Sequence, residues 1–457
     1  MKLIGWITVF FLGLSIINII AYRIKAIEKI SFAFPIGMGA NSIIFFIFEL
    51  LHISLKSIDL IIGIELALGI VLSIITIRKM RPVFSFELIF KKNVLKKSGM
   101  LNLSWFFFMG VILFVAYIMI RKSLFWPIVQ FDSIAGYDFV AKAMATEGTL
   151  NSSIFNSENP VYSIRSLYPP LAPINFGFAY LLGHTSSQIV VLIFFLCTIS
   201  SFYLFLKRNS THLCAAFFTL LLLITPEYAA FSTISSSNIP CTFYTSIGML
   251  CLYTWFTEKD QNYFTIGVVL MAFAVWTRTE AIVFAAGGGF MILLDGIRNK
   301  KKIPLLIFGL ACFAALALWQ WYIKQILHAS FAQPVLDHIT WDPEKLGRMF
   351  DQIKHVTFST VYFGATILLF IGMVVLNIKN IFSNRDQVIL LISIFSTWLL
   401  YVAVFYFINT DYTSSSMEGW IFSGYKRGMF CFLPLILFYS ANNKISQQVF
   451  NKYLSLP

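Results

Sequence analysis

Residues 101–120 read LNLSWFFFMGVILFVAYIMI, and residues 126–142, shortly after them, read WPIVQFDSIAGYDFVAK. The first stretch is apolar over about 20 residues, the length that an α-helix needs to cross the hydrocarbon core of a bilayer. The second stretch carries two carboxylates, Asp132 and Asp138, among aromatic side chains. This pairing predicts a membrane-spanning helix that leads directly into a polar site at the membrane surface.

The composition of the whole chain supports the same class. Of its 457 residues, 58% are hydrophobic and only 12% are charged, and the mean hydropathy is +0.79. A soluble domain usually carries about 25% charged residues. The apolar runs are continuous and do not alternate over about 10 residues, which excludes a β-barrel. We therefore expect an all-α polytopic membrane protein.

The excess of basic residues gives a net charge of +13. Lys and Arg occur in short clusters between apolar runs, which indicates membrane topology and speaks against nucleic acid as a partner. The six cysteines form no CxxC pair, so neither a disulfide framework nor a zinc site is indicated.

A hydropathy window of about 19 residues predicts thirteen spans. They cover residues 3–21, 32–51, 58–77, 101–120, 186–206, 213–227, 239–256, 263–277, 280–294, 303–323, 357–376, 388–408 and 428–441. A further apolar segment, Tyr168–Leu182, begins with three prolines and is short for a crossing. We expect it to be a juxtamembrane or re-entrant helix.

The positive-inside rule orients the chain. With the N-terminus outside, the dense basic clusters at 78–97 and 298–302 both fall on the cytoplasmic side. The predicted units are an N-terminal three-helix segment with a basic cytoplasmic loop, a transmembrane core with an outer loop, and a short cytoplasmic tail. They cover residues 1–100, 101–441 (outer loop 121–185) and 442–457.

Asp132 and Asp138 are the first candidates for chemistry. A carboxylate at the membrane edge can deprotonate a substrate hydroxyl or hold a metal ion. Six residues make about 1.7 helical turns, so the two side chains would not align as in a glycosidase pair. One catalytic and one structural carboxylate fit this spacing better; the alternative is a pair of solvated loop acids.

Two groups of charges near predicted spans are further candidates. Arg278 and Glu280 lie between apolar runs, where charged residues usually face a cavity; mutual pairing is the structural alternative. Lys426 and Arg427 precede the last predicted span among aromatics, which suits a lipid phosphate, although interfacial snorkelling explains them equally. The outer histidines lack metal-ligand spacing, and no phosphate-binding glycine motif of a soluble nucleotide site occurs.

Four separated motifs follow the order found in one family. They are Phe131-Asp132 with Tyr137, Tyr168-Pro169-Pro170-Leu171, Thr277-Arg278-Thr279-Glu280, and Tyr425-Lys426-Arg427 with Pro434. Through them, residues 101–440 resemble the GT-C superfamily of membrane glycosyltransferases. The resemblance is greatest to the bacterial branch similar to protein O-mannosyltransferases and aminoarabinose transferases.

The resemblance implies a GT-C-like fold and a glycosyltransferase that moves a sugar from a polyprenyl-phosphate donor to an acceptor on the outer face. The acceptor would be a glycan, a lipid or a protein, and the anomeric centre would be inverted. By the same resemblance Asp132 would be the base, with Asp138 supporting or replacing it. Arg278, Lys426 and Arg427 would hold the donor phosphate, which suits a departing anion. Six further residues would shape the site or contact the acceptor: Tyr137, Lys142, Arg165, Tyr168, Glu280 and Glu418.

The chain departs from the family pattern at Asp132, which is followed by Ser133 instead of a second acid. We therefore expect no cofactor and no divalent metal. Three predicted spans, not one, precede the family-like core. We expect a multi-pass protein of a bacterial inner membrane, with its active site facing the exterior and with membrane lipids and a lipid-linked donor as partners.

Two other functions stay open. An O-antigen or capsule polymerase or ligase shares the many-span plan and the basic outer residues. A lipid-linked sugar flippase or transporter belongs to another class, and it should show inverted repeats or broken spans at matching positions of its halves. The sequence shows neither feature.

Overall fold

The computed structural model describes residues 2–79, 99–152, 164–328, 341–382, 384–407 and 417–452. These residues form helices and no strand, which confirms the all-α class. Eight of the described helices are long and apolar enough to cross a membrane. They are α1 (Lys2–Ile20), α2 (Ala26–Leu50), α3 (Ile58–Lys79), α4 (Gly99–Phe125), α7 (Gln188–Asn209), α13 (Ala281–Asn299), α14 (Ile303–Gln325) and α19 (Arg385–Phe407).

The other five predicted spans coincide with shorter or interrupted helices. They are α8 (His212–Leu223), the continuous run of α10 (Asn238–Thr242), η5 (Phe243–Ile247) and α11 (Gly248–Glu258), then α12 (Gln261–Thr277), α17 (Thr366–Leu376) and α22 (Leu433–Asn442). Residues 421–431 and α22 meet at 45°, and together they are long enough to form a ninth span. The total of thirteen stays a prediction.

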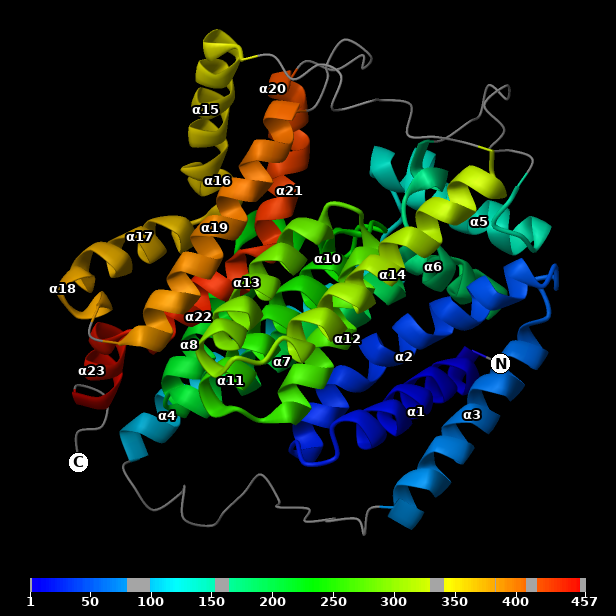
Figure 1. The fold of residues 1–457 in the computed structure, drawn as a ribbon, viewed down its shortest axis with the longest axis horizontal. Helices are drawn as coiled ribbons and strands as arrows, with labels where there is room; N and C mark the ends of the chain where they lie inside the picture. Colours follow the sequence, from blue (N-terminus) through cyan, green and yellow to red (C-terminus); the bar gives the residue numbers. More distant parts are fainter. Residues whose placement is uncertain are drawn as a thin grey trace.

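The remaining described helices are short and belong to the connections. They are η2 (Ser133–Tyr137), α5 (Asp138–Glu147), η4 (Ile164–Leu167), α6 (Leu171–Leu181), α9 (Pro226–Phe231), α15 (Pro343–Thr357), α16 (Thr360–Phe363), α18 (Ile378–Ile381), α20 (Met417–Trp420), η7 (Ile421–Tyr425), α21 (Lys426–Gly428), η8 (Met429–Cys431) and α23 (Lys444–Lys452). Figure 1 shows α5 and α6 at one end of the helix bundle, with α23 and the C-terminus at the other.

The first three helices pack on one another and on the rest of the bundle. A Cβ at Gly13 of α1 would lie 1.9 Å from the Ala33 carbonyl oxygen of α2, so only glycine allows the two helices to approach this closely. On its other side α2 packs against α6 and α7. The boundary near residue 100 is a prediction, and α2 joins the two predicted units.

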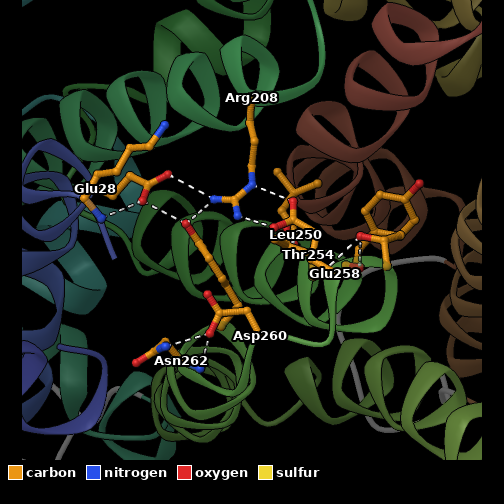
Figure 2. A network of polar contacts seen from close by, with 11 residues as sticks. Glu28, Arg208, Leu250, Thr254, Glu258, Asp260 and Asn262 are labelled. Carbon is orange, nitrogen blue, oxygen red and sulfur yellow. Dashed lines mark hydrogen bonds and ion pairs between the residues drawn. The ribbon is translucent and has the colours of Figure 1, made fainter. Parts of the chain in front are cut away.

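A polar network ties four helices together at the end of the bundle opposite α5 and α6. Arg208 of α7 donates from Nε to Glu258 of α11 at 2.6 Å, and its Nη1 lies 3.5 Å from Glu28 of α2 (Figure 2). The Tyr263 hydroxyl of α12 donates to the same Glu28 at 2.8 Å. We call these four residues the Arg208 network. It brings together three connections that the charge pattern assigns to one side of the membrane.

Helix α6 is buried in the bundle and packs against α2. Asn175 in α6 donates to the Met38 carbonyl in the middle of α2 at 3.1 Å. Just before α6, the Leu167 carbonyl accepts a hydrogen bond from Trp319 at 3.0 Å, and just after it Ser187 donates to Asp138 at 2.5 Å. The segments that flank α6 therefore contact α14 and α5, and a juxtamembrane or re-entrant position for α6 stays a prediction.

Candidate functional site

Asp132 and Arg427 form an ion pair between positions 295 residues apart. Asp132 directly precedes η2, and Arg427 lies in α21 at the bend before α22. The Arg427 Nε donates to the Ser423 carbonyl at 2.7 Å, which fixes the guanidinium so that Nη1 faces Asp132. Both side chains are partly buried, Arg427 at 18% and Asp132 at 25% exposure. The pair joins the first and last motifs of the predicted site.

Arg278 is held in the connection between α12 and α13. Its Nε donates to Glu280 at 2.9 Å, Nη1 donates to the Asn238 side chain, and the guanidinium carbon lies 6.0 Å from the centroid of the Tyr168 ring. Burial favours the neutral acid at Glu280, but the charge and hydrogen bonds of Arg278 outweigh it and hold the pKa of Glu280 below its ordinary value. Glu280 is therefore a carboxylate that stabilises Arg278.

Arg278 and Arg427 line the same small pocket. Its walls are Asn238, Cys241, Arg278, Glu280, Ala281, Phe284, Tyr401, Arg427, Gly428 and Cys431. A Cβ at Gly428 would lie 1.8 Å from the Tyr401 hydroxyl, so this wall requires glycine. Two guanidiniums face one small concave surface, and guanidiniums are groups that bind phosphate oxygens.

Lys426 points to a different partner from its neighbour Arg427. Its Nζ lies 2.5 Å from Glu227 of α9, and it is 4.6 Å from the ring centroid of Tyr362 and 5.0 Å from that of Phe422. It does not belong to the pocket lining. The sequence therefore grouped two adjacent cations that occupy separate environments.

Asp138 is buried, with 2% of its side chain exposed. It accepts hydrogen bonds from the Tyr180 hydroxyl and from Ser187 at 2.5 Å, and Lys142 lies 3.0 Å away. These contacts attach the start of α5 to the C-terminal end of α6 and to the segment before α7. Asp132 and Asp138 thus have separate partners, and Asp138 is placed to hold the outer segments together.

A polar segment before α10 connects these groups. Ser235 accepts from Ser133 at its carbonyl (3.0 Å), its hydroxyl lies 2.7 Å from that of Ser187, and Ser237 donates to the Tyr137 hydroxyl at 2.9 Å. We call residues 235–238 the serine segment. Sequence reasoning missed it and also missed Asn238 and Glu227. The run Ser235-Ser236-Ser237-Asn238 ahead of an apolar helix was the available signal.

The other predicted site residues are distributed as follows. The rings of Tyr137 and Tyr168 are in edge contact at 5.8 Å, next to Arg278. Lys142 belongs to the Asp138 cluster, and Glu418 lies 3.6 Å from Arg348 of α15. The Arg165 side chain lies outside the described residues. Among the described side chains, no group of three or more His, Cys, Asp or Glu could hold a metal ion.

The fold and this pocket define a polytopic helical membrane protein with a cationic site at one end of its bundle. Residues 168–321 match the family described as dolichyl-phosphate-mannose-protein mannosyltransferase. This match identifies a GT-C-type glycosyltransferase domain and confirms the resemblance. It indicates a membrane glycosyltransferase with a lipid-linked sugar donor. Neither the curated proteins nor the solved structures contain a match to the chain.

The matched segment begins at Tyr168 and contains Arg278 and Glu280. Asp132 and Arg427 lie outside it, so their assignment rests on their motifs, on the ion pair between them and on the pocket that Arg427 shares with Arg278. The family match and the ion pair therefore concern different parts of the chain.

Proposed function

We propose that the protein transfers a sugar from a polyprenyl-phosphate carrier to an acceptor hydroxyl at the outer face of a bacterial inner membrane, with inversion. The observation that supports this most strongly is the contact of Asp132 with Arg427, which itself lines a pocket together with Arg278. The displacement requires a base for the acceptor hydroxyl and cations for the departing phosphate, and Asp132, Arg427 and Arg278 are groups of these kinds.

In the proposed reaction Asp132 takes the proton of the acceptor hydroxyl. The freed oxygen attacks the anomeric carbon, the bond from that carbon to the phosphate oxygen breaks, and its electron pair stays on the phosphate. Arg278 and Arg427 neutralise the charge that develops there. A positioned base of this kind typically contributes about 10²- to 10⁴-fold in rate.

Exposed apolar side chains beside Asp132 support a donor that arrives in the membrane. Phe125, Val129 and Phe131 expose 70%, 61% and 77% of their surfaces. Helix α4, which leads into this segment, is also largely exposed to its surroundings. Apolar surface next to a charged pocket suits a ligand with a prenyl chain and a phosphate head.

The proposal can be tested with the purified full-length protein in proteoliposomes that contain a labelled polyprenyl-phosphate sugar and a membrane extract as the acceptor source. We expect labelled product, with equal activity when EDTA is present because the proposed chemistry uses no divalent metal. Asp351→Asn, which neutralises an exposed carboxylate on α15, is the control and should be as active as the wild type.

Two results would count against the proposal. Movement of the labelled lipid across the bilayer without any transfer would favour the flippase or transporter. Joining of preformed oligosaccharide chains, without transfer of single sugars, would favour the polymerase or ligase. Loss of activity in EDTA and its recovery with a divalent cation would overturn only the expectation that no divalent metal is needed. The proposed transfer reaction would stand.

A further inference from the structure

Each cation assigned to the donor phosphate already holds a carboxylate. Arg278 is paired with Glu280, Lys426 with Glu227, and Arg427 with Asp132. Positive and negative charges therefore balance within these three pairs. An arriving phosphate must take over a cation that another anion occupies.

The Arg427 pair differs from the other two because its carboxylate is the proposed base. A carboxylate that is paired with a guanidinium accepts a proton less readily than an unpaired one, since protonation would end the attraction. The base and the cation that should serve the leaving group thus hold each other in the ligand-free protein.

We propose that Asp132 and the donor phosphate compete for Arg427, so that donor binding releases Asp132 to act as the base. This inference rests on the proposed function. Arg427 is anchored through Nε to the Ser423 carbonyl, and its Nη1 makes the contact with Asp132. The guanidinium can therefore exchange one anion for another at Nη1 and keep its anchor, while Arg278 supplies the second cation of the pocket.

The charge balance of the reaction fits such an exchange. The donor phosphodiester carries one negative charge, and the released phosphate carries nearly two at neutral pH. During transfer Asp132 gains a proton and loses its negative charge. The phosphate gains one negative charge when its bond to the sugar breaks. The net charge of the site stays constant, and Arg427 faces the anion that remains. The donor must therefore bind before the acceptor hydroxyl can be deprotonated.

Binding of farnesyl phosphate to the purified full-length protein tests the competition without catalysis. Asp132→Asn removes the competitor for Arg427. The Kd of this variant for farnesyl phosphate should therefore be about 3- to 10-fold lower than that of the wild type, within the range of coupling between contacting residues. Arg427→Gln should raise the Kd, and in the double variant the gain from Asp132→Asn should disappear. Asp351→Asn is the charge-matched control and should bind farnesyl phosphate as the wild type does. Farnesol, which has no phosphate, measures binding through the prenyl chain alone.

The outcomes separate the two levels of the proposal. Wild-type protein that binds farnesyl phosphate no better than farnesol would overturn the proposed function and the competition together. Phosphate-dependent binding that is unchanged or weakened by Asp132→Asn would overturn the competition and leave the donor site intact.

A kinetic measurement on unaltered protein provides a second test. The pH dependence of kcat/KM for the donor reports the free enzyme, and that of kcat reports the substrate-bound enzyme. Because donor binding removes Arg427 from Asp132, the acid limb of kcat should lie about one pH unit above that of kcat/KM. Coinciding limbs, or the reverse order, would contradict the competition.

Discussion

At Arg278 the guanidinium is 15% exposed, and its partner Glu280 is 27% exposed. Charges near a membrane are unfavourable unless they are paired or face water, so each cation of the site requires its carboxylate in the empty protein. The pairing that the sequence allowed as a purely structural alternative for Arg278 is therefore present, and Arg278 nevertheless lines the pocket. In the proposed function this one residue therefore serves both stability and donor binding.

The lowered pKa of Glu280 gives a pH-dependent prediction. A carboxylate whose pKa is lower in the folded state stabilises the fold above its unfolded pKa of about 4.3, and this contribution is lost as the pH falls through the folded value. Glu280→Gln should therefore lower the thermal unfolding midpoint at about pH 7, and the difference from the wild type should shrink below about pH 4. A difference that is constant over this range would contradict the ionised pair.

Residue-level prediction from the sequence was partial for a physical reason. Side chains with an unusual chemical setting, such as Arg278 in an apolar surrounding, are recognisable from neighbours alone. The contact of Asp132 with Arg427 spans 295 positions, and no local pattern encodes it. The separate partners of Lys426 and Arg427 likewise depend on how α21 is oriented.

At the scale of elements, apolar run length predicted the position of the long helices because crossing a membrane sets their length. Local deviations from regular α-helical geometry could not be predicted from the sequence. Gly136 inside η2 has φ −137° and ψ −111°, which interrupts the helix between Asp132 and Asp138. The ideal helical geometry used for their spacing therefore does not describe this segment, although the conclusion that the two carboxylates act separately agrees with their contacts.

The Arg208 network gives a prediction about helix packing. Glu28→Gln should lower the free energy of unfolding by about 1–3 kcal/mol, because Glu28 is buried and Arg208 loses one of its two carboxylate partners while it keeps Glu258 and Tyr263. The measurement is the thermal unfolding midpoint in detergent. Asp351→Asn serves as the exposed control, and an equal midpoint for both variants would show that the network contributes nothing to packing.

At the scale of the whole molecule, the connections predicted for one side of the membrane gather at one end of the bundle. The Arg208 network joins three of them, and the candidate site joins connections predicted for the other side. The basic clusters could predict this grouping because successive spans place every second connection on the same side of the membrane, and the clusters mark which side that is. They could not establish the total of thirteen, since several of these helices are short and α22 is bent.

Cysteine labelling in intact cells tests the predicted orientation. Val129 and Lys300 are exposed at opposite ends of the bundle, and the six native cysteines are buried. Val129→Cys should react with a membrane-impermeant maleimide, whereas Lys300→Cys should react only after the membrane is permeabilised. The reverse pattern would place the candidate site in the cytoplasm.

The most direct measurement of the central claim is sugar transfer by Asp132→Asn under conditions in which the wild type is active. Asn keeps the size of the side chain but cannot accept the proton, so transfer should fall by about 10²-fold or more. Phosphate-dependent binding of farnesyl phosphate by the same variant would show that its site is intact. Transfer at the wild-type rate would contradict Asp132 as the base, and with it the reaction proposed for this pocket.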